Sequence, residues 1–398
     1  MTNNIYFLYA NHPVIKIDNR YFSYTKNFVD FFIELSKVSS NYNLILPCKN
    51  SLKSDVNMED LVLLDVTDRV NIIEVRSYKG HFGALFTTLI NAYNLKKIIR
   101  RKSIRKNIYL AGPGPNSMIF WLTYFVPEYK RVFFFIRGDT VKTVQHMYKN
   151  KWWGRVPVFI SSIFQKRISE LLLQDKAQVF TYGDVLKEKY LKYSENVFSI
   201  APLISNDMII KCESSDYVEN FDKIRLLFVG RLSAEKGVFE LIEAVNHTML
   251  NGIPIALTIV GNGVLKDKLE NFILSNKLEN CIKIVGHIAS GPKLWNFFDK
   301  SDVLCVPSYT EGVPRVIVES FARCVPVMAT SVGSVPFMFP EDTVFLKNNS
   351  IEEIEKGIKW CYKNKDKLKF KGKHGLSLVD SFVIKNNIDF VNKIFIKL

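Results

Sequence analysis

Two segments in the C-terminal half of the chain combine charged side chains with glycine. The first, Leu227–Gly237, places Arg231 and Lys236 between a strand-like apolar run and a helical pattern. Gly230 permits a tight turn, and the free amides of a helix N-terminus attract anions, as the two cations do. Arginine offers phosphate oxygens a planar fork, and lysine offers a flexible point charge. The segment predicts a phosphate-binding turn, with a surface loop of solvated charges as the alternative.

The second segment, Ser308–Ser320, leads from a loop into another helical pattern. Pro314 suits the first turn of a helix, where its missing N–H would have no partner in any case. The backbone amides of Gly312 and Val313 would then face a phosphate at the start of that helix. This segment predicts a second part of the same anion site.

Two carboxylates belong to the second segment. Glu311 stands in the loop, and Glu319 follows three apolar residues in the helix. A carboxylate on such a buried helix needs hydrogen-bond donors, which the hydroxyls of a ribose would supply. The alternative is that Glu311 caps the helix and Glu319 is structural.

The elements that position these residues alternate between strand and helix along the chain. Many strand-like runs are apolar on both faces, which is typical of a parallel sheet covered by helices on both sides. The pattern predicts two doubly wound domains that face each other across a cleft, with ligands at the carboxyl ends of the strands. The clearest predicted strands are Ile5–Ala10, Asn43–Pro47, Val70–Val75, Asn107–Gly112, Val132–Arg137, Gln178–Tyr182, Leu226–Val229, Ala256–Val260, Ile282–Val285, Val303–Val306 and Val327–Ala329.

A length of 398 residues fits two domains of ordinary size. The polar, acidic stretch Ser205–Lys223 suits a connection between them. We therefore expect an N-terminal domain over residues 1–205 and a C-terminal domain over residues 206–380. Residues 381–398 have the pattern of an amphipathic helix.

In combination, these motifs resemble family 4 of the retaining glycosyltransferases. The family's Gly-Arg-Leu-x-x-x-Lys-Gly motif is similar to Gly230–Gly237, and its Glu-x7-Glu motif is similar to Glu311 with Glu319. Val260–Gly263 resembles the family's glycine pair after a strand, and Ser301–Ser308 resembles the strand before the second motif. The resemblance covers roughly residues 226–336.

The resemblance implies a GT-B fold with two Rossmann-like domains, and transfer of a sugar from a nucleotide-sugar donor with retention of configuration. Arg231 and Lys236 would bind the donor diphosphate and stabilise it as the leaving group. Glu311 would approach the donor sugar, and Glu319 would hold the ribose. The first domain would bind the acceptor, and the helix of residues 381–398 would pack back on it. The donor site would also include Gly230, Gly263, Gly312 and Val313.

No metal or cofactor is expected. The resemblance implies metal-independent transfer, and the sequence has no Asp-x-Asp motif between a strand and a loop. The six cysteines are scattered without a CxxC or another metal-ligand spacing. They are expected to be free thiols in a reducing compartment.

The sequence departs from the family in several places. Cys324 stands where the family often has glycine, and Gly333–Pro336 replaces a common glycine pair with a following glutamate. The family's glycine-rich loop after the first strand corresponds to Val14–Lys26, which has no glycine. Arg20 in that stretch would contact the donor or lie on the surface.

Two further strand ends of the first half are candidates for the acceptor side. Arg137 and Asp139 end the apolar run that begins at Phe133. They would bind an acceptor or a phosphate, or would form a structural ion pair. Gly112–Pro115 is either another binding loop or a plain turn.

Lysine and arginine exceed aspartate and glutamate by 54 − 39 = 15. Such a charge favours polyanions: nucleic acid, anionic lipid or phosphorylated small molecules. Basic residues crowd the stretch 96–106, and the segment Lys149–Arg155 adds two tryptophans to them. Tryptophan beside lysine and arginine suits contact with an anionic membrane surface. The alternative is a solvated basic face with the tryptophans in the core.

The start of the chain lacks a charged signal-peptide region, and the apolar run Met118–Val126 is shorter than the roughly 20 residues of a bilayer span. We therefore expect a cytoplasmic protein, peripherally associated with the inner face of the cell membrane.

The expected function is sugar transfer to a saccharide or lipid-linked saccharide in capsule, O-antigen or other bacterial envelope polysaccharide synthesis. A sugar-nucleotide epimerase, or another enzyme of the GT-B fold such as a phosphorylase, is the alternative, although no set of acid and base residues or cofactor lysine for it is identified. A nucleic-acid-binding protein is a rival from another class. It is disfavoured because the chain has no RNP motif, zinc framework or helix-turn-helix pattern. A catalytically inactive binding module is also disfavoured, because the motif residues Arg231, Lys236, Glu311 and Glu319 are all present.

Overall fold

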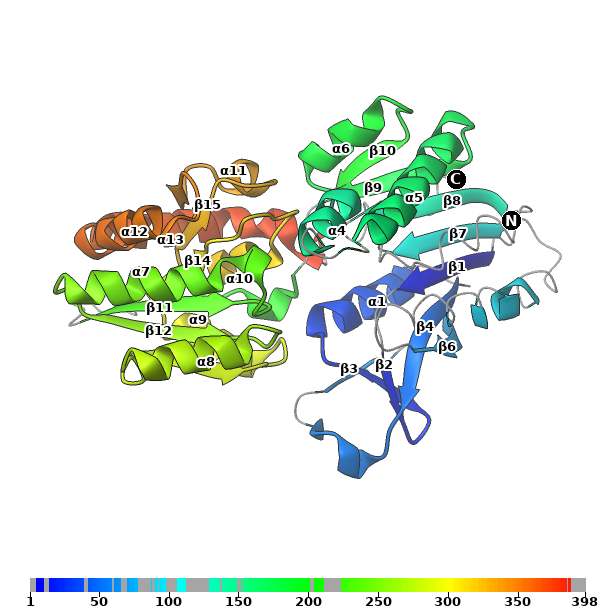
Figure 1. Ribbon diagram of the computed structural model, residues 1–398. Coiled ribbons are helices and arrows are strands. Elements are labelled where there is room, and N and C mark those ends of the chain that lie inside the picture. Colours follow the sequence, from blue (N-terminus) through cyan, green and yellow to red (C-terminus); the bar gives the residue numbers. More distant parts are fainter. Residues whose placement is uncertain are drawn as a thin grey trace. The chain divides into compact units, whose positions relative to one another are not determined.

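The chain divides into two compact units, with the boundary between Ala201 and Pro202 and the second unit extending to Asp389. The sequence-based boundary was placed four residues later. The computed structural model (Figure 1) describes residues 5–10, 14–38, 42–58, 61–65, 70–77, 87, 90–91, 93–97, 106–111, 129–136, 138–148, 152, 154–200, 204–210, 223–384 and 386–387. The expected cleft depends on how the units are placed relative to each other and stays a prediction.

The described strands of the first unit form a ten-stranded sheet. Its order is β10-β9-β8-β7-β1-β4-β2-β3-β5, and β6 pairs with β4. All pairs are parallel except those of β3 with β2 and β5. The bounds are β1 Ile5–Ala10, β2 Val14–Ile17, β3 Arg20–Ser23, β4 Tyr42–Asn50, β5 Val62–Leu63, β6 Val70–Arg76, β7 Lys106–Ala111, β8 Tyr129–Ile136, β9 Ala177–Tyr182 and β10 Val197–Ile200.

Helices pack against this sheet, and a core forms between them from side chains of β4, β6, β8, β9, α5 and α6. The described helices of this unit are α1 Lys26–Val38, α4 Thr140–Tyr148, α5 Arg155–Leu173 and α6 Asp184–Leu191, with a short 3-10 turn at Lys53–Asp55; another 3-10 turn, Asn206–Met208, belongs to the second unit. The alternating pattern therefore predicted β1, β4, β6, β7, β8 and β9, but it missed β2, β3, β5 and β10.

The stretch Val14–Lys26, which corresponds to the family's glycine-rich loop, is instead a β-hairpin. Asp18 and Asn19 form its turn with φ values of 47° and 60°, the left-handed conformation that two-residue hairpin turns require. Arg20 follows the turn and is exposed. A short hairpin of β2 and β3 therefore stands where the resemblance to the family would place a loop over the donor.

The second unit contains a six-stranded parallel sheet in the order β13-β12-β11-β14-β15-β16. Numbered from β11, this is the doubly wound order 3-2-1-4-5-6, in which the strand order reverses between β11 and β14. The strands are β11 Ile224–Val229, β12 Ile255–Val260, β13 Ile282–Gly286, β14 Val303–Val306, β15 Val327–Thr330 and β16 Thr343–Leu346. The predicted parallel α/β sheet is confirmed here.

Two hydrophobic cores occupy the two faces of this sheet. One contains side chains of α7, α8 and α12, and the other contains side chains of α9 and α10. The bounds are α7 Val238–Leu250, α8 Lys266–Ser275, α9 Pro292–Asp299, α10 Arg315–Ala322, α11 Val335–Met338, α12 Ile351–Lys363 and α13 Lys365–Leu378, with 3-10 turns at Ala234–Lys236 and Val379–Phe382. Pro314 lies one residue before α10 and caps it, so it does not occupy the first turn as expected.

The predicted C-terminal helix is wrong at its start. Residues Val379–Phe382 form a 3-10 turn, and Val383 then makes a parallel bridge with Ile204. The Ile204 amide donates to the Phe382 carbonyl at 2.9 Å, and the Ile384 amide donates to the Ile204 carbonyl at 3.0 Å. Val383 is therefore extended where a helix was expected, whereas the described residues after it, Ile384, Asn386 and Asn387, are helical as predicted. Residues 388–398, with the proposed packing on the first domain, lie outside the described residues.

Candidate active site

The two motif segments lie at the carboxyl ends of β11 and β14, which are neighbours in the sheet. After β11 the chain passes through Gly230 and the 3-10 turn Ala234–Lys236 into α7. After β14 it passes through the loop that carries Glu311 into α10. The strand order therefore brings together segments that are 75 residues apart in sequence.

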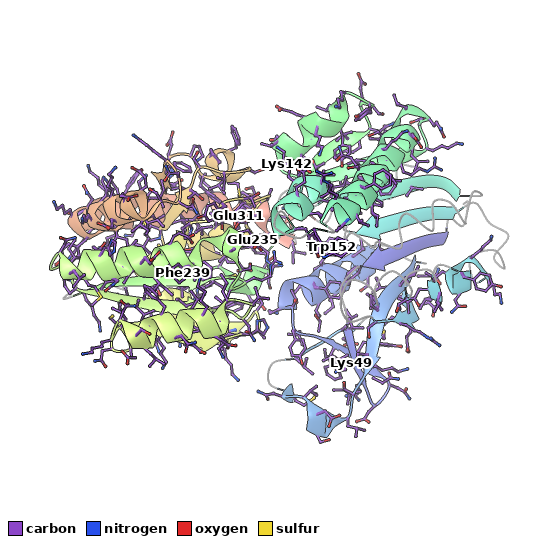
Figure 2. The ribbon with its side chains drawn as sticks, in the orientation of Figure 1. Lys49, Lys142, Trp152, Glu235, Phe239 and Glu311 are labelled. Atoms are coloured by element: carbon purple, nitrogen blue, oxygen red, sulfur yellow. The ribbon has the colours of Figure 1, made fainter. Side chains whose placement is uncertain are left out.

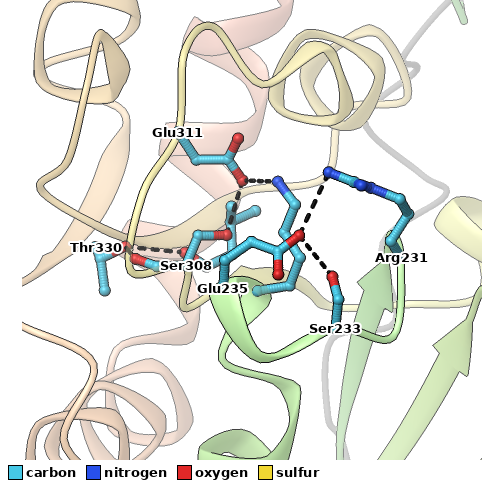
Figure 3. A network of polar contacts seen from close by, with 8 residues as sticks. Arg231, Ser233, Glu235, Ser308, Glu311 and Thr330 are labelled. Atoms are coloured by element: carbon cyan, nitrogen blue, oxygen red, sulfur yellow. Dashed lines mark hydrogen bonds and ion pairs between the residues drawn. The ribbon is translucent and has the colours of Figure 1, made fainter. Parts of the chain in front are cut away.

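Lys236 and Glu311 form an ion pair at the meeting point of these loops. Lys236 Nζ donates to Glu311 Oε1 at 2.6 Å, and Ser308 Oγ donates to the same oxygen at 2.7 Å (Figure 3). The two charged side chains are 20% and 9% exposed. A cation and a carboxylate are thus held side by side with little room for water around them.

Arg231 lies on the other side of the turn. Its side chain is 65% exposed, and Nη2 lies 3.4 Å from Glu235 Oε1. The same carboxylate oxygen accepts a hydrogen bond from Ser233 Oγ at 2.7 Å. Burial alone would raise the pKa of Glu235. Hydrogen bonds from Ser233 and from its own backbone amide, with the charges of Arg231 and Lys236, nevertheless hold that pKa below its ordinary value.

Two glycines let the backbone segments of the site approach each other. Gly237 has φ = +65°, and a Cβ atom there would lie 1.9 Å from the Pro307 carbonyl oxygen. Gly333 has φ = +59°, and its Cβ would lie 2.0 Å from the Glu311 carbonyl oxygen. The loop that carries Glu311 is therefore held between the turn before α7 and the segment after β15.

The other predicted donor-site glycines lie in the same region. The Gly230 amide donates to the Val260 carbonyl at 3.0 Å, and Gly263 lies against the Leu232 carbonyl. The carbonyl of Gly312 accepts from the Ser334 amide at 3.0 Å. Val313, which follows Gly312 in the sequence, is half-buried.

Glu319 has a different environment from Glu311. It is 5% exposed on α10, and Oε1 accepts a hydrogen bond from Arg315 Nε at 3.0 Å. Arg315 thus supplies one of the donors that a buried carboxylate needs. The role of Glu319 toward a ribose stays a prediction.

Of the acceptor-side candidates, the structure describes only Asp139. Asp139 Oδ1 accepts from the Lys142 amide at 3.2 Å, and Oδ2 accepts from Lys189 Nζ at 2.9 Å. Asp139 therefore caps the start of α4 and links it to α6. Arg137 and Gly112–Pro115 lie outside the described residues.

Three polar residues of the site had no assigned role in the sequence. Glu235 forms an ion pair with Arg231, Ser308 Oγ donates to Glu311, and Thr330 Oγ1 donates to the Ser308 carbonyl at 2.6 Å. Glu235 stands four residues after Arg231, and Ser308 three before Glu311, which are spacings that allow side chains to meet in a turn. Thr330 has no such signal, because its contact depends on the pairing of β14 with β15.

Comparison with known proteins shows what the second unit is similar to. Residues 213–374 match the family model "Glycosyl transferases group 1". The chain is 30% identical over 216 residues to an uncharacterized glycosyltransferase of Methanocaldococcus jannaschii, a match that covers 53% of this chain and 58% of that protein. It is 32% identical over 142 residues to a putative teichuronic acid biosynthesis glycosyltransferase of Bacillus subtilis, covering 34% and 32%. The chain thus spans about half or less of these relatives.

The fold extends further than the sequence match. Sucrose-phosphate synthase from Thermosynechococcus elongatus superposes with a TM-score of 0.73 at 15% identity, over 99% of both chains. This likeness shows a shared fold and confirms the GT-B class predicted from the motifs.

Proposed function

We propose that the chain transfers a sugar from a nucleotide-sugar donor to a saccharide or lipid-linked saccharide acceptor, which the match of residues 213–374 to the glycosyl transferases group 1 model supports. The observation that carries the proposal is the Lys236–Glu311 pair, at the point in a doubly wound sheet where ligands bind. Arg231, two residues after the end of β11, adds a second, exposed cation beside it.

In this proposal the cations stabilise the departing nucleoside diphosphate. As the bond between the sugar C1 and the phosphate oxygen breaks, negative charge grows on the diphosphate, and positioned cations lower the barrier. Lys236 would exchange Glu311 for a phosphate oxygen. Glu311 would then be available to the donor sugar, which becomes positively charged in the transition state, and Glu319 would hold the ribose.

The products follow from the same step. A new bond forms between C1 and an acceptor hydroxyl oxygen on the face that the diphosphate leaves, so the configuration at C1 is retained. The hydroxyl proton leaves with the nucleoside diphosphate or passes to water. Arg231 and Lys236 supply the positive charge at the leaving group, and we propose that the reaction needs no metal.

We further propose that the acceptor belongs to an envelope polysaccharide pathway and that the protein works at the inner face of the cell membrane. The similarity to a teichuronic acid glycosyltransferase supports the first part. An apolar face of α5 supports the second: Phe159 is 66% exposed, and Val156 on the same face is exposed too. Trp152, just before the helix, is 94% exposed (Figure 2). In the described part of the chain, no helix is long and apolar enough to cross a bilayer.

The basic residues of this helix favour an anionic lipid surface. Arg155 and Lys166 are exposed on the same side as Phe159, at helical spacing. Ser161, by contrast, is buried, and its hydroxyl donates to the Pro157 carbonyl at 2.8 Å. The first half of α5 therefore presents apolar and basic groups to solvent, which suits contact with a bilayer interface.

The test is release of nucleoside diphosphate from a panel of nucleotide sugars, with crude membrane lipids as acceptor. We expect one donor to be consumed, and Lys236→Ala and Glu311→Ala to lower kcat at least about 100-fold, as loss of a charge-stabilising group does in other enzymes. Lys266→Ala, which breaks an exposed ion pair on α8, is the control and should keep full activity. If no donor is consumed or bound, the proposal is wrong.

A further inference from the structure

Glu235 is a buried carboxylate that the proposed reaction does not use directly. It is 9% exposed, in the 3-10 turn between the two motif cations. Burial of a carboxylate is costly unless charges and hydrogen bonds compensate it. Here the compensation comes from Ser233 Oγ at 2.7 Å and Arg231 Nη2 at 3.4 Å, both on Oε1.

The contact also restricts Arg231. An arginine that is 65% exposed has many accessible rotamers, and fixing it at the moment of binding would reduce affinity. A neighbouring buried carboxylate restricts those rotamers before the ligand arrives. It also leaves most of the guanidinium facing solvent, where a phosphate can reach it.

We propose that Glu235 is a positioning residue that holds the Arg231 guanidinium ready for the donor diphosphate. The inference rests on the proposed function, because it assigns Glu235 to the same donor site. Glu235 touches no substrate in this role; it acts through Arg231.

The backbone of Glu235 has a second contact that the side chain does not share. Its carbonyl oxygen accepts from the Tyr309 amide at 2.9 Å, and Tyr309 Oη donates to Glu240 Oε1 at 2.7 Å. This bond ties the turn to the loop that carries Glu311. A change confined to the Glu235 side chain leaves the backbone tie in place and isolates the effect of the carboxylate.

Glu235→Gln is the informative substitution. The amide keeps the size of the side chain, and its oxygen can still accept from Ser233, but it carries no charge to hold Arg231. Glu270→Gln is the matched control, because Glu270 pairs with Lys266 at 3.6 Å in an exposed position on α8.

The experiment is a double-mutant cycle with Arg231→Gln, read by calorimetric titration of the full chain with UDP and GDP and by kcat and KM for the donor. We expect Glu235→Gln to weaken nucleoside diphosphate binding about tenfold, the low end for loss of an orienting partner in other sites. In the Arg231→Gln background the same substitution should weaken binding less than twofold, because the residue through which it acts is already lost. Where Arg231→Gln brings binding below detection, the same cycle is read from donor turnover.

Three results would overturn the inference. Full affinity in Glu235→Gln would show that the carboxylate does not position Arg231. If Glu235→Gln lowered the affinity for nucleoside diphosphate by the same factor in wild type and in Arg231→Gln, and lowered the melting temperature by the same amount in both, Glu235 would only support the fold. A wild-type protein that binds no nucleoside diphosphate would overturn the proposed function together with the inference, whereas the first two results leave the proposed function standing.

Discussion

At the scale of single residues, the motifs predicted Arg231, Lys236 and Glu311 as one site, and the structure places them on neighbouring loops. The reason is that parallel strands bring their carboxyl ends to one edge, so residues after adjacent strands meet. The sequence did not reveal Glu235, because its partner geometry depends on a turn whose exact shape no pattern specifies. Glu319 was predicted to be buried, and it is, but with Arg315 as a partner.

Gly333→Ala should damage both stability and activity. Its φ of +59° is unfavourable for alanine, and the new Cβ would lie 2.0 Å from the Glu311 carbonyl oxygen, so the loop must shift. We expect the free energy of unfolding to fall by about 2–4 kcal/mol. We also expect kcat to fall, because Glu311 moves with its loop. Chemical denaturation and donor turnover measure the two effects.

Gly252→Ala is the control for this prediction. Its φ of +84° is equally unfavourable, but nothing lies within 4 Å of the new Cβ. It should lower the free energy of unfolding by about 1 kcal/mol, because only the backbone conformation is unfavourable for alanine, and it should leave kcat unchanged. Equal effects of the two substitutions would mean that the contact with the Glu311 loop does not matter.

At the scale of elements, the apolar pattern located the strands well, since a strand buried on both faces reads as a continuous apolar run. It failed where a short local signal decided the structure. The turn at Asp18 and Asn19 makes a hairpin of a segment expected to be a loop, and the bridge at Val383 replaces the start of a helix. Helix α5 shows another limit: periodicity indicates an apolar face, but not whether that face is turned inward.

The exposed face of α5 predicts membrane binding that depends on its apolar residues. Wild-type protein should sediment with anionic liposomes at low salt, and Phe159→Ser with Trp152→Ser should reduce the sedimented fraction several-fold. The reason is that two large apolar side chains no longer enter the lipid interface. Leu274→Ser, at an exposed apolar residue of α8, is the control. A wild-type protein that stays in the supernatant would end the membrane proposal.

At the scale of the whole molecule, the fold shared with sucrose-phosphate synthase covers 99% of the chain. The family match covers only residues 213–374. The two-domain architecture was predictable, since the strand–helix alternation runs through most of the chain. Details of the first unit were not, because the resemblance to the family covered only residues 226–336 and loops differ most between proteins of one fold.

Removal of divalent metal should not change turnover. In the proposed reaction Arg231 and Lys236 stabilise the leaving diphosphate, so EDTA should leave kcat within about twofold of its value with added Mg²⁺. The measurement is nucleoside diphosphate release in both conditions on the same preparation. Loss of activity in EDTA that Mg²⁺ restores would assign part of this role to a metal.

The Lys236–Glu311 pair has one more consequence, for the protein without substrate. Each group is the other's counterion, so this pair adds no net charge to the site without substrate. An isolated small anion would have to separate the pair and leave a carboxylate uncompensated in a nearly dry site. A complete nucleotide sugar brings both a diphosphate for the lysine and hydroxyl groups for the glutamate. The site thereby favours the whole donor over a small anion, and inorganic phosphate should be a poor competitor.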